Sequence, residues 1–218
     1  MQLPFTTDQF LGVMRAYNEA VWPAQLLLLV LGVAAVVFAR RADRVGARSA
    51  GLLLAALWAW MGVVYHLVFF RPINPAATIF GAAFLLQAVL LAWAALSGRL
   101  VFERRRDAGA AAGAAAILYA MALYPALGHA LGHRYPTLPT FGLPCPTTIL
   151  TLGMLLWARP GSVALLAPIP LLWAAVGTSA ALRLGMREDF GLAIAAMLLV
   201  LDVSRRSWRA RTHRLQRS

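Results

Sequence analysis

Residues 49 to 70 read SAGLLLAALWAWMGVVYHLVFF, an apolar run that contains a single histidine. A helix needs about 20 such residues to cross the hydrocarbon core of a bilayer, so this run predicts a membrane span. The rest of the 218-residue chain has the same character, because 61% of its residues are hydrophobic and only 13% are charged. Soluble domains carry about 25% charged residues. We therefore predict an all-α membrane protein.

Six further apolar runs accompany this one and predict a bundle of seven transmembrane helices. The seven expected spans are residues 24–39, 49–70, 73–96, 108–131, 140–158, 162–182 and 190–201.

The spans divide the chain into two parts. Residues 1–204 form the expected membrane domain, in which 1–22 are an interfacial segment on the outer surface. Thr6 and Gln9 match the capping-box pattern and predict a short helix there. Residues 205–218 form a basic cytoplasmic tail.

Arginine sets the expected orientation of the bundle. The chain has 20 basic residues, all of them arginine, so any activity that needs a Schiff-base lysine is excluded. Fifteen of these arginines lie in the loops after the first, third and fifth spans and in the tail, and five lie on the opposite side. Cytoplasmic loops are enriched in basic residues. We therefore place the N-terminus outside and the C-terminus in the cytoplasm, in the inner membrane, and expect no nucleic-acid partner.

Polar residues gather at the predicted outer ends of the spans. Because polar groups inside a membrane are costly, they mark candidate functional sites. Glu19, His66, His129 and Cys145 are residue types that bind a divalent transition metal such as zinc, and they are our candidate metal ligands. Further candidates for lining an outward-facing cavity are Asn18, Gln25, Asn74, His133, Thr147, Thr148, Glu188 and Asp189.

Other interpretations of these residues remain open. Asn18, Gln25 and Asn74 are also suited to pairing with backbone groups that a broken helix leaves free. Cys145 is the only cysteine in the chain, which excludes an intrachain disulfide, and a buried cysteine often serves as a small hydrophobic residue. The proline-rich segment 135–146 predicts a broken fifth helix whose extended part lines a cavity enclosed by protein.

A weak internal repeat is also present. Trp58 precedes Gly62 by four residues in the second span, and Trp173 precedes Gly177 by four in the sixth. This spacing suggests three helices, one linker helix and three more in the same orientation, as in transporters built from parallel repeats.

Several motifs resemble those of a bacterial multi-spanning membrane family, domain of unknown function six-zero-six-four. They are PFTTDQF from residue 4, YNEAVWPAQ from 17, WMGVVYH from 60, PINPAA from 72 and PCPTT from 144. The resemblance covers nearly the whole chain and implies a membrane fold without implying an activity. A looser resemblance is to seven-helix metal-dependent membrane hydrolases, although Gly62 stands where their helix 2 serine would be, and the histidine pair lies on the fourth span instead of the seventh.

Three functions are compatible with these patterns. The first is binding or transport of a metal ion or small solute at the outer polar cluster. The second is a metal-dependent hydrolase at the outer leaflet, with Glu19 or Glu188 as the base for a metal-bound water. The third is a receptor or structural subunit. All three have the lipid bilayer as a partner, and the oligomeric state is left open.

Overall fold

The structure is a computed structural model that describes residues 4–215. Its helices are α1 (Thr7–Val21), α2 (Ala24–Arg41), α3 (Arg44–Trp60), η1 (Met61–Phe70), α4 (Ala77–Leu96), α5 (Ala108–Leu118), η2 (Tyr119–Leu123), α6 (Tyr124–Ala130), α7 (Pro144–Leu155), α8 (Pro160–Leu166), α9 (Pro168–Leu184), η3 (Arg187–Asp189) and α10 (Phe190–Leu215). Between residues 4 and 215 there is no β-strand, only two isolated bridges. The predicted all-α class is confirmed.

Side-chain caps explain where several helices begin. Thr6 and Gln9 form the expected capping box at the start of α1. The carboxylate of Asp43 accepts a 2.6 Å hydrogen bond from the backbone N–H of Gly46. Because this cap satisfies a free N–H of the first turn, α3 starts at Arg44, earlier than the apolar run at residue 49.

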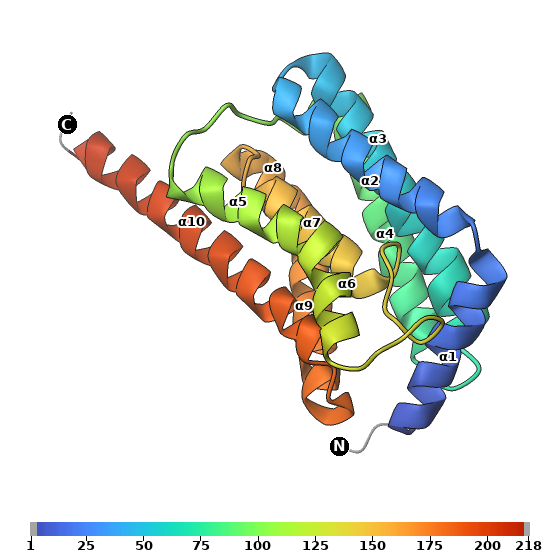
Figure 1. Cartoon of the computed structure of the whole chain (residues 1–218). Coiled ribbons are helices and arrows are strands. Elements are labelled where there is room, and N and C mark those ends of the chain that lie inside the picture. The colour runs from blue at the N-terminus through green and yellow to red at the C-terminus, as the bar shows by residue number, and fades with distance from the viewer. Residues whose placement is uncertain (1–3, 216–218) are drawn as a thin grey trace.

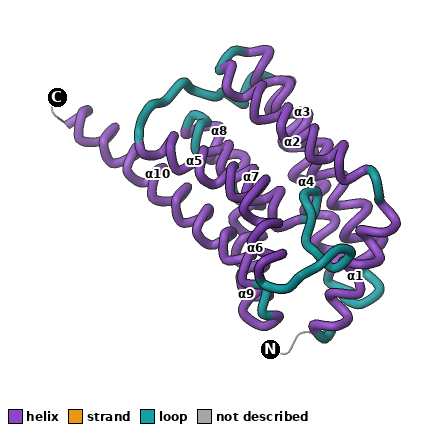
Figure 2. The backbone as a smooth tube through the Cα atoms, in the orientation of Figure 1, coloured by secondary structure: helices purple, strands orange, loops and turns teal. Residues whose placement is uncertain are grey.

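The helices form two groups that meet along α7. Helices α2, α3 and α4 run side by side, while α5, α9 and α10 surround α7 on its other sides (Figures 1 and 2). Every residue of α7 from Pro146 to Leu155 is buried. In the second group the backbones of α5 and α7 approach closely, because a Cβ added to Gly113 would lie 2.7 Å from the carbonyl oxygen of Gly153. Small residues at such crossings are typical of helix packing in membranes.

The connections gather at two opposite ends of the molecule. One end holds the turn between α2 and α3, the loop between α4 and α5, and the end of α10 (Figure 1). The other end holds α1 and the turn between α9 and α10. The loops that we expected on one side of the membrane therefore share one end.

The sixth predicted span is bent. Helices α8 and α9 meet at an angle of 56°, beside Pro168 and Pro170. Because Pro170 has no N–H, the carbonyl of Leu166 has no partner within the helix. The side-chain amide of Gln87 from α4 donates a 3.0 Å hydrogen bond to this carbonyl.

Two segments are wound as π-helices. In η1 the N–H of Arg71 bonds to the carbonyl of His66, five residues earlier. In η2 the N–H of Tyr124 bonds to the carbonyl of Tyr119. Segments of this kind occur frequently at functional sites, and both lie near the end of the molecule that holds α1.

Four helices are long and apolar enough to cross a membrane, namely α2, α3 with η1, α4, and α5 to α6. The bent pair α8 and α9 would make a fifth. Helix α7 measures only about 18 Å at 1.5 Å per residue. Helix α10 carries Asp202 and several arginines and runs without a break to Leu215, across our boundary at residue 204. The count of seven spans and the orientation stay predictions, and tail residues 216–218 lie outside the described residues.

Candidate functional site

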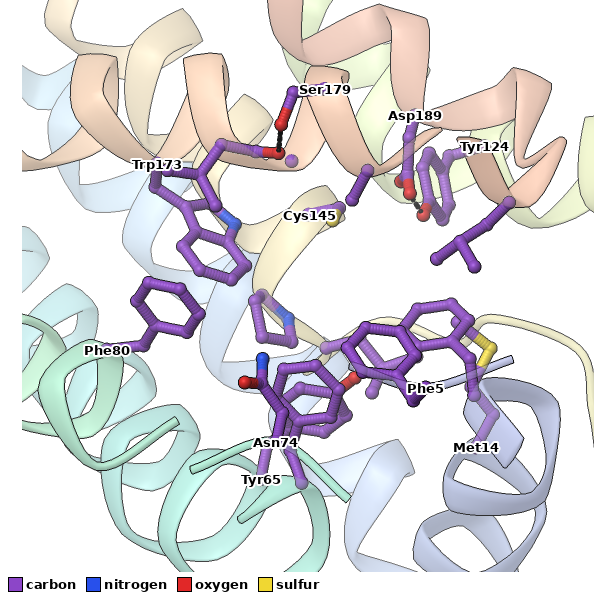
Figure 3. A pocket seen from close by; sticks show the side chains of 18 residues that line it. Phe5, Met14, Tyr65, Asn74, Phe80, Tyr124, Cys145, Trp173, Ser179 and Asp189 are labelled. Carbon is purple, nitrogen blue, oxygen red and sulfur yellow. Dashed lines mark hydrogen bonds between the residues drawn. The ribbon is translucent and has the colours of Figure 1, made fainter. Parts of the chain in front are cut away.

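A cavity of about 120 Å³ lies near the α1 end, between the two helix groups. One wall comes from the α1 segment, η1 and α4 and is mainly aromatic, formed by Phe5, Phe10, Met14, Tyr65, Phe70 and Phe80. The opposite wall carries most of the polar atoms, with Tyr124, Cys145, Trp173, Ser179 and Asp189 (Figure 3). The cavity therefore combines aromatic rings with a small polar patch.

Asp189 is the centre of the polar wall. It ends the short helix η3, which follows the left-handed Gly185 at the C-terminus of α9. Its carboxylate accepts a 2.5 Å hydrogen bond from the hydroxyl of Tyr124, and the thiol of Cys145 contacts the same carboxylate. Tyr124 reaches this position directly after the π-helical turn η2.

The charge of Asp189 has no cationic partner within residues 4–215. The side chain is only 4% exposed, and the ion pairs of the described residues do not include it. Its two contacts, a phenol and a thiol, are neutral groups. Burial of a charged group is unfavourable unless the group is paired, so this carboxylate needs a proton or a cation from outside the described chain.

Glu188, the neighbouring carboxylate, is different because it has a partner. Its Oε1 lies 2.9 Å from Nδ1 of His133, a residue in the loop after α6. The backbone carbonyl of Glu188 also accepts a 2.6 Å hydrogen bond from Tyr119. Glu188 is fully buried but faces this loop, and it does not line the cavity.

His66 lies one layer behind the cavity wall and is fully buried. Its ring packs edge-on against Phe84 at a centroid distance of 4.5 Å and against Trp173 at 5.0 Å. Among the described residues, neither ring nitrogen has a hydrogen-bond partner. The indole N–H of Trp173 also has no hydrogen-bond partner among the described residues, although it faces the sulfur of Cys145. Trp173 lines the cavity, so its indole N–H is available to a bound molecule or water, whereas His66 does not line the cavity.

Asn18 organises the irregular segment before α7. Its amide donates hydrogen bonds of 2.6 and 2.8 Å to the carbonyls of Pro136 and Leu138, and its oxygen accepts from Thr140 and Gln25. Gln25 also donates a 3.1 Å hydrogen bond to the backbone carbonyl of Asn18. Asn18 and Gln25 thus satisfy broken backbone, as one of our interpretations expected, and neither lines the cavity.

The four predicted metal ligands do not converge in the part of the chain that the structure describes. Glu19 is exposed on α1, and His129 is exposed beside the guanidinium of Arg134. His66 packs against the ring of Trp173, and Cys145 lies near the indole N–H of the same residue. No group of three or more His, Cys, Asp or Glu side chains within residues 4–215 could hold a metal ion. The metal-centre hypothesis and the hydrolase that depends on it gain no support.

The remaining predicted residues have mixed positions. Asn74 lines the cavity and its Oδ1 accepts a 3.1 Å hydrogen bond from the N–H of Ala76, which opens α4. Asp189 also lines it. The hydroxyls of Thr147 and Thr148 are buried in α7, without a hydrogen-bond partner among the described residues.

Our sequence reasoning missed Tyr124, Trp173 and the aromatic wall. We treated aromatic residues in the spans as ordinary apolar side chains, and nothing in the apolar pattern reveals a π-helical turn. Trp173 had one signal, its spacing from Gly177, but we interpreted that spacing as part of a repeat.

Comparison with known families gives one match. The profile of a family described as "Family of unknown function (DUF6064)" matches residues 7–214. The chain belongs to this family. No curated protein and no solved structure matches the chain. The residues that match the family contribute to both walls of the cavity, since Tyr65, Asn74 and Cys145 lie within the matched range.

Proposed function

We propose that this DUF6064 protein is a membrane protein that binds a small organic solute in the cavity between its two helix groups. The observation that carries the proposal is the cavity itself, which is largely apolar and has a few polar groups that converge on one wall. Small-molecule sites in proteins have this composition. The indole N–H of Trp173, which has no hydrogen-bond partner among the described residues, adds to this argument.

The proposed topology puts the cavity near the outer surface. The arginine-rich end of the molecule is opposite to the cavity, so the positive-inside rule orients the cavity outward. The solute then enters from outside the cell or from the outer leaflet. Opening of one helix group against the other would change access to the site, as in secondary transporters.

The weak repeat supports two related helix groups. Gly62 packs against the backbone of Gly81 in α4, where an added Cβ would lie 3.1 Å from the carbonyl oxygen. Gly177 occupies the matching place on α9 and packs against Leu192 of α10, where an added Cβ would lie 2.5 Å from its side chain. In both groups the glycine four residues after a tryptophan faces the next helix: Gly62 meets the backbone of α4, and Gly177 meets a leucine side chain of α10.

The sole cysteine gives a direct test of the cavity. Methyl methanethiosulfonate, a small neutral reagent, should modify Cys145 in the purified protein. Choline or its neutral analogue 3,3-dimethylbutan-1-ol, added separately, should slow the reaction by occupying the cavity. If neither solute changes the rate, the proposed function is wrong.

A pair of variants on α9 controls this experiment. Ala180 lines the cavity and Ala175 is exposed on the same helix without lining it. Ala180→Trp should fill the cavity and strongly slow the modification, and added solute should slow the remaining reaction no further. Ala175→Trp should react and be protected like the wild type.

A further inference from the structure

We propose that the solute is a small organic cation with a compact apolar body, such as a substituted ammonium ion. This inference rests on the proposed function and specifies its ligand class. It follows from two features of the cavity that are independent of each other, the aromatic faces of one wall and the uncompensated carboxylate of the other.

The aromatic faces suit a positive charge. Phe5, Phe10 and Phe70 form one cluster, with ring centroids 5.3 Å apart for Phe5 and Phe70 and 6.1 Å apart for Phe10 and Phe70. Tyr65 stacks on Phe70 at 5.6 Å, and Phe80 and Trp173 continue the lining at a separation of 5.4 Å. The face of an aromatic ring attracts cations, and cages of such rings recognise quaternary ammonium groups.

Asp189 supplies the negative charge across the cavity. Its neighbours on the polar wall are Tyr124 and Cys145, both neutral donors, and the adjacent carboxylate of Glu188 is already paired with His133. A cation in the cavity would compensate the buried carboxylate that no described residue pairs. An anionic solute would instead face both Asp189 and the negative faces of the rings.

The size of the cavity limits the ligand. A cavity of comparable volume, about 150 Å³, holds one benzene molecule in an engineered protein. A volume of about 120 Å³ therefore accepts a body of roughly six heavy atoms. A trimethylammonium group meets this limit, whereas a lipid with intact acyl chains does not fit inside. The indole N–H of Trp173 can donate a hydrogen bond to one acceptor on the ligand, such as a hydroxyl.

Charge selectivity at Cys145 tests the inference on the wild-type protein. Three methanethiosulfonates differ in charge: the trimethylammonium-ethyl reagent is cationic, the sulfonatoethyl reagent is anionic and of similar size, and the smaller methyl reagent is neutral. Each rate at Cys145 is divided by the rate of the same reagent with a free thiol in solution. We expect the normalised rate of the cationic reagent to exceed that of the anionic one by at least about tenfold. Equal normalised rates would overturn the inference.

Asp189→Asn then identifies the origin of the selectivity. Loss of the carboxylate changes the reactivity of the Cys145 thiol toward all three reagents alike, so the ratio between reagents is the informative quantity. The ratio of the cationic to the anionic rate should fall several-fold, because only the aromatic wall would then favour the cation. Asp8→Asn, which removes an exposed carboxylate at the same end of the molecule, should leave it unchanged. A ratio that is insensitive to Asp189→Asn would contradict the role of this residue.

Equilibrium binding completes the test without a variant. Choline and 3,3-dimethylbutan-1-ol have nearly the same shape but differ by one charge. Protection of Cys145 should require at least about tenfold less choline than alcohol. If the alcohol protects as well as choline, the cation inference is wrong while the proposed solute site stands, and Asp189 then carries a proton. If neither protects, the proposed function itself fails.

Discussion

At the scale of single residues, Gln87 and Asn18 show why polar side chains are present in apolar helices. Each is buried, and each donates to backbone carbonyls that helical bonding leaves free. A buried carbonyl without a donor costs about 1–3 kcal/mol. These two residues therefore support the broken segments on which the cavity wall depends.

Gln87→Leu should lower the free energy of unfolding by about 1–3 kcal/mol. The leucine fills a similar volume but leaves the carbonyl of Leu166 without its donor, at a bend where Pro170 offers none. Unfolding by denaturant in detergent micelles measures the change. Thr78→Val, at an exposed position on the same helix, is the control and should change little. Equal stability of the two variants would show that water replaces the amide of Gln87.

Asn18→Leu should loosen the segment between α6 and α7. Two carbonyls of this segment lose their donor, and Thr140 loses its acceptor, so the backbone should open more often. Limited proteolysis should then cut within residues 132–143 several times faster than in the wild type. The neighbouring exposed Glu19→Gln serves as the matched control. A cutting rate that matches the control would mean that packing alone holds the segment.

At the scale of elements, α7 is fixed at its C-terminal end by charged side chains. Arg105 donates a 2.7 Å hydrogen bond to the carbonyl of Leu156 and two bonds, of 2.8 and 2.9 Å, to the carboxylate of Asp202 in α10. Arg206 pairs with the same carboxylate at 2.5 Å and donates to the carbonyl of Ala158. Positive side chains at the C-terminus of a helix also complement its dipole.

Removing either partner of this bidentate pair should destabilise the protein. Both side chains are mostly buried, at 11% and 12% exposure, so Arg105→Ala or Asp202→Ala should each cost about 1.5–3 kcal/mol. The double variant should cost less than the sum, because the partners act on each other. Arg106→Ala, at an exposed position, should be nearly neutral. Additive costs in a denaturant-unfolding cycle would argue against a coupled pair.

Elements differ in how far the sequence predicts them. Apolar runs locate the helices, because burial and membrane insertion both select for hydrophobic side chains. The start of α3 at Arg44 depends on the cap at Asp43 instead of on apolarity, so our boundary was late. The π-helical turns η1 and η2 are invisible to a hydrophobic pattern, and the positions of Tyr65, His66 and Tyr124 depend on them. That is why Asp189 was among our candidates while its partner Tyr124 was not.

At the scale of the whole molecule, the two ends have different chemistry. The end with the α4–α5 loop and the end of α10 carries most of the arginines, while the α1 end carries the aromatic cavity, Asp189 and Glu188. The end at which each loop lies follows from the sequence, since each span reverses direction. Contacts between distant helices, such as the hydrogen bond from Trp58 of α3 to Thr151 of α7, cannot be predicted from the sequence, because similar apolar spans can pack in many orders.

The positions of the termini constrain the number of membrane crossings. The described chain begins at the α1 end and finishes at the opposite end (Figure 1), so it passes from end to end an odd number of times. Four crossings alone would return it to the first side. Five crossings would also satisfy this parity, but the turn between α9 and α10 lies at the α1 end (Figure 1). We therefore expect α7, the bent pair α8 and α9, and α10 to cross once each, which gives seven.

Cysteine labelling in intact cells tests this topology. In a Cys145→Ala background, Asp8→Cys places a thiol at the α1 end and Ser97→Cys places one in the loop between α4 and α5, both at exposed positions. A membrane-impermeant maleimide should label the first in intact cells, and the second only after the membrane is opened, because the arginine-rich end faces the cytoplasm. The reverse pattern would place the cavity on the cytoplasmic side, and labelling of both in intact cells would require an even number of crossings between them.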